Sequence, residues 1–135
     1  MVFPGRRPYL KWLTAVYILY ALIWIPLEGN LVRVVVMGVG TTAVALAHLA
    51  QRFLGGKTLT RTQWLGATAV LGLLLGLGSS LLTLLFMAVK TGLHAHGPEF
   101  TLQQIAWVWQ QLPLWSLAGL ISGLGLGMIT MNGER

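Results

Sequence analysis

The chain has 135 residues, of which 56% are hydrophobic and 9% are charged, and its formal net charge is +6. Soluble domains carry about 25% charged residues, so a chain this poor in charge is excluded from that class, and lipid is predicted to surround most of it. Cysteine is absent, which excludes disulfides and thiolate metal sites, and the positive charges are spread between apolar stretches, which favours membrane orientation over nucleic-acid binding.

Four apolar stretches are each long enough for a membrane-spanning helix, which needs about 20 residues at 1.5 Å per residue. They cover residues 10–27, 31–53, 64–89 and 113–131. Backbone polar groups in lipid must be satisfied within their own segment, so stretches of this length are expected to be helical. We therefore predict an all-α, integral membrane four-helix bundle that forms a single transmembrane domain over residues 1–135.

The connections between these stretches are polar. Residues 28–30 join the first two spans as a tight hairpin, with Asn30 as the predicted N-cap of the second. In the longest connection, Thr101 and Gln104 have the spacing of a capping box. The apolar residues that follow predict a short amphipathic helix over 102–112 at the outer interface. Pro113 then starts the last span or kinks one continuous helix.

The distribution of lysine and arginine predicts the orientation. One side of the membrane would hold seven of these residues: Arg6, Arg7, Lys11, Arg52, Lys57, Arg61 and Arg135. The other side would hold only Arg33 and Lys90. We therefore expect a multi-pass protein of the inner (plasma) membrane with both termini in the cytoplasm.

Small residues recur every four positions in the last two spans, and this spacing lets two helix backbones approach closely. Either these spans pack on each other, or one groove faces another subunit. The first span carries Tyr17 near mid-membrane, where a phenol needs a hydrogen-bond partner in protein or ligand. The predicted helix-packing residues are Thr68, Gly72, Gly76 and Ser80 in the third span, and Gly119, Gly123 and Gly127 in the fourth.

Few ionisable residues lie in or beside the spans. Glu28 and Arg33 flank the hairpin between the first two spans, and they predict either a local ion pair or a gate for a charged substrate. His48 is the one ionisable residue well inside an apolar stretch. An imidazole there is a candidate for haem, quinone or proton binding, and the alternative is a packed interfacial residue.

The connection after the third span holds the nearest approach to a metal motif, His94, His96 and Glu99. Imidazole and carboxylate groups suit zinc or copper, whereas the simpler interpretation is a solvated turn. The chain has three acidic residues and no aspartate. This composition excludes a Ser-His-Asp triad and favours a protein that is not an enzyme.

Three functions are compatible with these features. The first is a structural or accessory subunit of a larger membrane complex, which fits the small size and the small-residue grooves. The second is a small transporter or channel acting as a homo-oligomer. The third is a metal- or cofactor-binding protein that uses the outer His94, His96 and Glu99 loop. The expected partners are the lipid bilayer and other membrane subunits or a second copy, and not nucleic acid; no particular cofactor is indicated.

Overall fold

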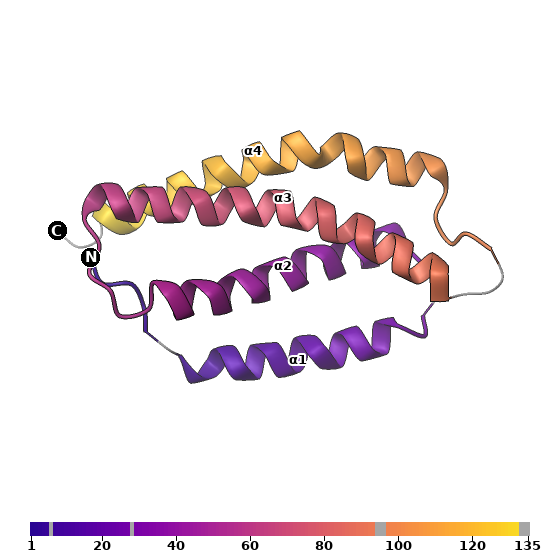
Figure 1. Cartoon of the computed structure of the whole chain (residues 1–135), viewed down its shortest axis with the longest axis horizontal. Helices are drawn as coiled ribbons and strands as arrows, with labels where there is room; N and C mark the ends of the chain where they lie inside the picture. The colour runs from indigo at the N-terminus through magenta and orange to yellow at the C-terminus, as the bar shows by residue number, and fades with distance from the viewer. Residues whose placement is uncertain (6, 28, 94–96, 133–135) are drawn as a thin grey trace.

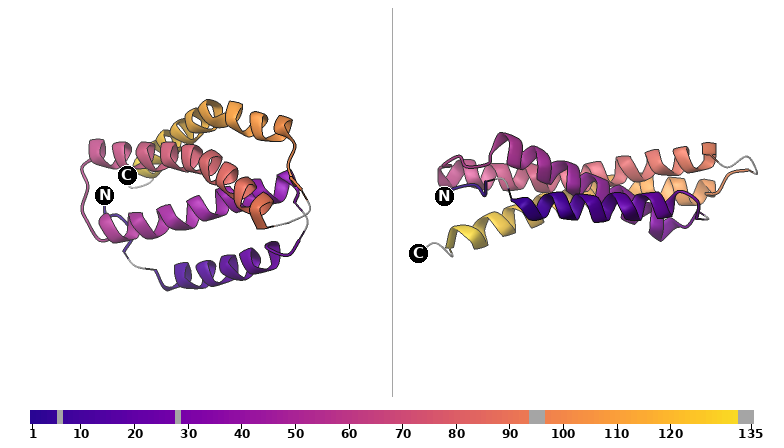
Figure 2. Two further views of the ribbon diagram at one scale, coloured as in Figure 1. Left: turned by 45° about the vertical axis from the view of Figure 1, so that its right-hand side comes forward. Right: turned by 90° about the horizontal axis from the view of Figure 1, so that it is seen from below.

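The computed structural model describes residues 1–5, 7–27, 29–93 and 97–132. Over these ranges the fold is all-α, as predicted, with four helices: α1 (Pro8–Trp24), α2 (Leu31–Phe53), α3 (Arg61–Leu93) and α4 (Leu102–Asn132). The helices run up and down in chain order, and α1 lies along α2 on the side away from α4 (Figures 1 and 2). The bundle is therefore open between its first and last helices.

Three of the described helices, α2, α3 and α4, are long and apolar enough to cross a membrane. The remaining helix, α1, has 17 residues and is not among them. Large apolar side chains cover its outer surface, including Trp12 at 75% and Val16 at 65% exposure. Apolar surfaces of this kind belong in lipid. The chain thus has the build of a small multi-pass membrane protein.

The first helix ends at Trp24, three residues before the end of the predicted span. Pro26 accounts for the difference, because the residue before a proline is disfavoured in a continuing helix. The backbone N–H of Leu27 donates to the Trp24 carbonyl at 3.1 Å and closes a turn. The next helix begins at Leu31, where the Asn30 side chain accepts the N–H groups of Val32 and Arg33 as an N-cap.

The predicted interfacial helix and last span form one continuous helix, α4, with Pro113 inside it. Of the two alternatives at Pro113, the structure thus has the continuous helix and not a separate helix over 102–112. The capping box is present, since the Thr101 N–H donates to Gln104 Oε1 at 2.9 Å and the Gln104 N–H donates to Thr101 Oγ1 at 3.2 Å. Pro113 removes one backbone N–H donor, but the residues on both sides remain helical, so the helix continues across it.

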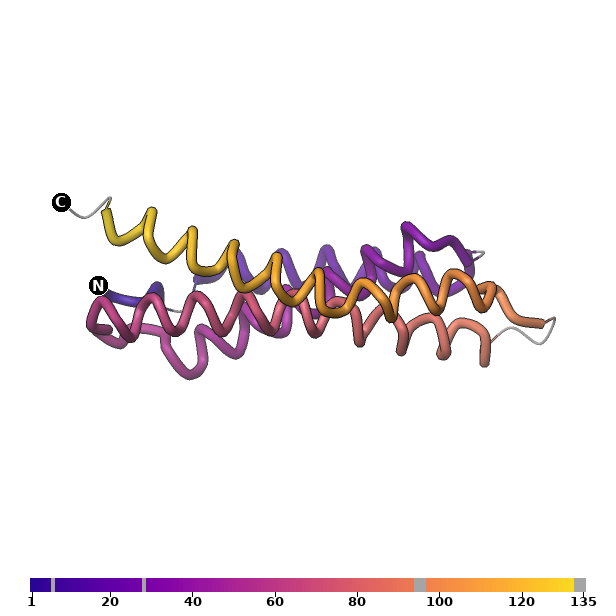
Figure 3. The backbone as a smooth tube through the Cα atoms, turned by 90° about the horizontal axis from the view of Figure 1, so that it is seen from above, coloured from indigo at the N-terminus to yellow at the C-terminus, as the bar shows by residue number. Residues whose placement is uncertain are grey.

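The two longest helices exceed the thickness of a bilayer core. With 33 residues in α3 and 31 in α4, they are about 50 and 46 Å long, against about 30 Å for the hydrocarbon. They must tilt or project into the interface. Figure 3 shows that α4 overlaps the middle of α3 and diverges from it toward the end of α4.

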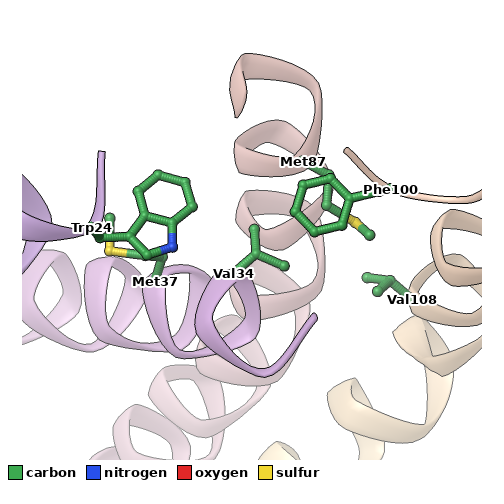
Figure 4. Close-up of a cluster of buried hydrophobic side chains, with 6 residues drawn as sticks. All are labelled: Trp24, Val34, Met37, Met87, Phe100 and Val108. Carbon is green, nitrogen blue, oxygen red and sulfur yellow. The ribbon is translucent and has the colours of Figure 1, made fainter. Parts of the chain in front are cut away.

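A cluster of buried apolar side chains joins all four helices at the end opposite the termini (Figure 4). It combines residues from the end of α1, the start of α2, the end of α3, the following connection and the start of α4. Trp24 packs edge-on against Phe86, with ring centroids 5.9 Å apart. The members are Trp24, Val34, Met37, Met87, Phe100 and Val108.

The N-terminal segment pairs with the turn between α2 and α3 at the other end. Val2 and Thr58 form an isolated antiparallel bridge, and the Phe3 N–H donates to the Lys57 carbonyl at 3.0 Å. Trp64 Nε1 donates to Thr130 Oγ1 at 2.9 Å, which ties the start of α3 to the end of α4. The N-terminal residues, the α2–α3 turn and the end of α4 therefore lie at one end of the molecule (Figure 1).

Candidate functional site

Helices α3 and α4 approach each other through glycine. A Cβ atom on Gly72 would meet the carbonyl oxygen of Gly119, and a Cβ on Gly119 would meet the carbonyl oxygen of Gly72. A Cβ on Gly76 would meet the Trp115 carbonyl and would lie 2.9 Å from Ser116 Cα. These are backbone atoms, which cannot move without moving a helix. The spacing of the two helices thus depends on bare backbone at this crossing.

The remaining predicted packing residues of these helices are Thr68 and Ser80 in α3 and Gly123 and Gly127 in α4. A Cβ on Gly123 would meet the Thr68 carbonyl oxygen, and one on Gly127 would meet Thr68 Oγ1. Ser80 is fully buried, and its hydroxyl donates to the Gly76 carbonyl at 3.4 Å. Thr68 therefore lies in the crossing with Gly123 and Gly127, and its hydroxyl, like that of Ser80, donates within its own helix.

Helices α2 and α3 make a second close approach, which sequence reasoning missed. A Cβ on Gly38 would lie 2.8 Å from the Ser79 carbonyl oxygen, and one on Gly78 would lie 2.7 Å from Thr42 Cγ2. The four-residue spacing of Gly38 and Thr42 was the available signal. The crossing places buried hydroxyl groups between two helices.

Those hydroxyl groups are satisfied within their own helices. Thr42 donates to the Gly38 carbonyl at 2.8 Å, and Thr83 donates to the Ser79 carbonyl at 2.7 Å. Ser79 does the same with the Leu75 carbonyl at 2.6 Å. A serine or threonine whose hydroxyl bonds to the backbone of its own helix presents mainly the methylene or methyl part of its side chain to neighbours. In the described part of the chain, the contact between α2 and α3 therefore has the character of a packing interface and not of a polar path for ions or solutes.

An apolar groove of about 590 Å³ opens between α2, α3 and α4. Its α2 side runs from Val35 to Ala50, a rise of about 24 Å along the helix axis. Small side chains make up much of its surface, so that a neighbouring chain could approach closely. They include Ala43 and Ala47 on α2, Gly72 and Gly76 on α3, and Ala118 and Ser122 on α4.

Lys90 has contacts that sequence reasoning missed, because it was counted only as a charge on the outer side. The side chain is fully buried, and Nζ donates to the carbonyl oxygens of Trp24 at 3.1 Å and Ile25 at 2.8 Å, and also to that of Leu27. The ammonium also lies 4.5 Å from the centre of the Trp24 ring. A cation at the carbonyl end of a helix is attracted to the negative end of the helix dipole, and a cation over an aromatic ring is attracted to its face. Lys90 thus fastens the end of α3 to the end of α1.

His48 lies near the cytoplasmic end predicted for α2, with an exposed side chain. Its Nε2 is 2.8 Å from Thr14 Oγ1 on α1. This contact joins two helices that otherwise meet mainly around Tyr17, whose hydroxyl donates to the Met37 carbonyl at 2.9 Å. The predicted cofactor-binding role of His48 stays a prediction.

The predicted ion pair and metal motif fall partly outside the described residues. Glu28, His94 and His96 lie there, so neither set is described as a whole. Arg33 is exposed in the first turn of α2, and Glu99 is half-buried with its carboxylate against the backbone of Gly29. Within residues 1–5, 7–27, 29–93 and 97–132, no three metal-binding side chains gather.

The candidate functional site is therefore the apolar groove, with the α3–α4 crossing as its floor. No protein-family model, curated protein or solved structure matches the chain. The function is argued from the groove and from the charged groups at the two ends of the bundle.

Proposed function

We propose that the chain crosses the membrane four times, with both termini and the α2–α3 turn in the cytoplasm. The grouping of these segments at one end supports an even number of crossings. Lys57 and Arg61 lie in or beside the turn at that end, which favours the cytoplasmic side. α1 is short for a span, but the apolar turn through Leu27 adds to the length that lipid surrounds.

We propose that the protein is an accessory subunit of a larger membrane complex, and that the groove between α2, α3 and α4 receives a membrane-spanning helix of a different protein. The groove carries this proposal. It is apolar, lies along the middle of the three helices, and its length of about 24 Å approaches the thickness of the hydrocarbon core. In lipid, helices associate through close packing of small residues, which the groove offers on all three sides.

The shape of the groove favours a different protein over a second copy. A two-fold dimer places the same surface on both partners. In such a dimer the two concave grooves would face each other, and neither would be filled by a helix. A head-to-tail contact would leave an open groove on each added copy unless a ring closed. A single helix from another protein fills the groove without either difficulty.

The test is native mass spectrometry of the tagged protein after gentle extraction from its own membrane. We expect a larger membrane protein in fixed ratio with the wild-type chain. Ala118→Trp fills the groove with an indole, and we expect it to lose that partner by at least about tenfold, since overpacking a close helix contact disrupts it.

Ala15→Trp is the matched control, because Ala15 is exposed on α1 and does not line the groove. It should retain the partner. If Ala118→Trp retains the partner as well as the wild type does, the groove is not the binding surface. A homo-oligomer sensitive to Ala118→Trp would instead support the transporter or channel alternative.

A further inference from the structure

A second pocket lies between the beginning of α1 and the end of α2, apart from the apolar groove. It has a volume of about 540 Å³ and is lined by residues of these two helices and of the segment that leads into α1. Three of its lining residues carry a positive charge, and none is acidic. The lining residues are Arg7, Leu10, Lys11, His48, Gln51 and Arg52.

Helix geometry gathers these charges. His48 and Arg52 are four residues apart and lie on one face of α2, whereas Arg7 is the N-cap of α1 and Lys11 lies in its first turns. Packing α1 against α2 brings these four residues to the same pocket. Arg7, Lys11 and Arg52 carry like charges that repel each other, so an anion in the pocket would lower this repulsion.

His48 lines this pocket, and one hydrogen bond holds its ring against α1. The Thr14 hydroxyl donates its single hydrogen to the Leu10 carbonyl at 2.7 Å, so it accepts from Nε2 of His48 at 2.8 Å. With Nε2 as the donor, Nδ1 of the neutral ring is an acceptor. The amide of Gln51 and the guanidinium groups of Arg7 and Arg52 add further N–H donors.

The start of α1 adds to the positive field. The N-cap position is Arg7, and its side chain makes no capping hydrogen bond. The backbone N–H groups of a helix's first turn carry partial positive charge and favour anions. The pocket thus combines exposed cationic side chains with one helix N-terminus.

We propose that this pocket binds an anion bearing a phosphate group. Guanidinium groups match phosphate oxygens in pairs, and lysine adds a point charge, so the donor set fits phosphate better than it fits a single small halide. Basic pockets between membrane helices commonly hold lipid headgroups.

The position of the pocket matches the level of lipid phosphates. Trp12 and Phe53 each follow a cationic lining residue and are 75% and 58% exposed. Exposed aromatic rings of this kind mark the membrane interface. Leu10, which is buried, gives the pocket an apolar wall on the side of the bundle. A headgroup would fit here with its acyl chains against the helices, and a free phosphate would reach the pocket from the aqueous side.

The experiment measures lipid retention by the purified full chain in a neutral detergent, using native mass spectrometry. Phosphatidylglycerol and phosphatidylcholine with identical acyl chains are the probes, and inorganic phosphate is added in excess as a competitor. We expect about tenfold preference for phosphatidylglycerol. Arg7→Gln with Arg52→Gln should abolish that preference, because it removes both guanidinium groups.

The matched control is Lys57→Gln with Arg61→Gln, which removes two charges at the same end but outside the pocket lining. It should keep the preference. Displacement of the lipid by inorganic phosphate would identify a free phosphate as the ligand, and resistance to displacement would identify the headgroup; either result supports the site. Equal retention by both double variants, or no preference in the wild type, would overturn the proposal. All four substituted side chains are exposed, and unchanged thermal unfolding verifies folding.

Discussion

Replacing Gly76 by alanine is expected to lower the free energy of unfolding by about 1–3 kcal/mol, as overpacking of a close contact does. The added methyl group would meet the Trp115 carbonyl and the backbone of Ser116, and neither can yield without displacing α4. The gain in helix propensity from glycine to alanine, about 1 kcal/mol, offsets only part of this loss. Reversible unfolding in mixed detergent measures the difference.

Gly66→Ala is the control for this prediction. It lies in the same helix, and a Cβ there meets nothing within 4 Å. This variant should gain stability by about 0.5–1 kcal/mol from propensity alone. If Gly76→Ala and Gly66→Ala shift stability by the same amount in the same direction, the α3–α4 crossing does not limit packing.

Replacing Lys90 by methionine is expected to destabilise the protein by about 2–4 kcal/mol, because several carbonyl groups lose a charged donor together. Methionine retains much of the volume and apolar stem of lysine, but it cannot donate to the carbonyl oxygens of Trp24, Ile25 and Leu27. Since these carbonyls end α1, the loss should appear first in that helix. Hydrogen exchange of the backbone amides of α1 should therefore accelerate more than that of α3.

Lys57→Met is the matched control, since Lys57 is exposed and its described hydrogen bonds use backbone atoms. It should leave both stability and the exchange of α1 unchanged within about 0.5 kcal/mol. Wild-type exchange of α1 in Lys90→Met would show that the ammonium does not hold α1 to α3.

The all-α class and the three long apolar helices could be predicted because hydrophobicity is read directly from composition along the chain. The end of α1 was misplaced, since Pro26 outweighs the apolar character of the residues around it. The sequence left two alternatives open at Pro113, and the structure has the continuous helix. A proline at that place is compatible with a new helix or with a continuing one, and the surrounding tertiary packing decides.

The sites were harder to predict than the helices. The spacing of Gly72, Gly76 and Gly119 suggested a close contact, but its energetic weight stays a prediction that Gly76→Ala tests. Lys90 was counted only as a charge for orientation, because its partners are backbone carbonyls about 65 residues earlier in the chain. No local pattern reveals a contact of that kind.

The basic pocket was missed for a related reason. Arg7 and Lys11 read as orientation signals, and His48 read as a lone histidine in the second span. Only the packing of α1 on α2 brings them to one place. The predicted metal motif is not tested by the structure, because His94 and His96 lie outside the described residues. That hypothesis stays a prediction.

The most direct test of the accessory-subunit account is photo-crosslinking in the native membrane. A photo-reactive amino acid at Ser122 would face the groove, and one at Leu13 would sit on the exposed side of α1. The account predicts one discrete adduct with a larger membrane protein from Ser122 and none from Leu13. Adducts with lipid or with a second copy from Ser122, and no larger protein, would contradict it.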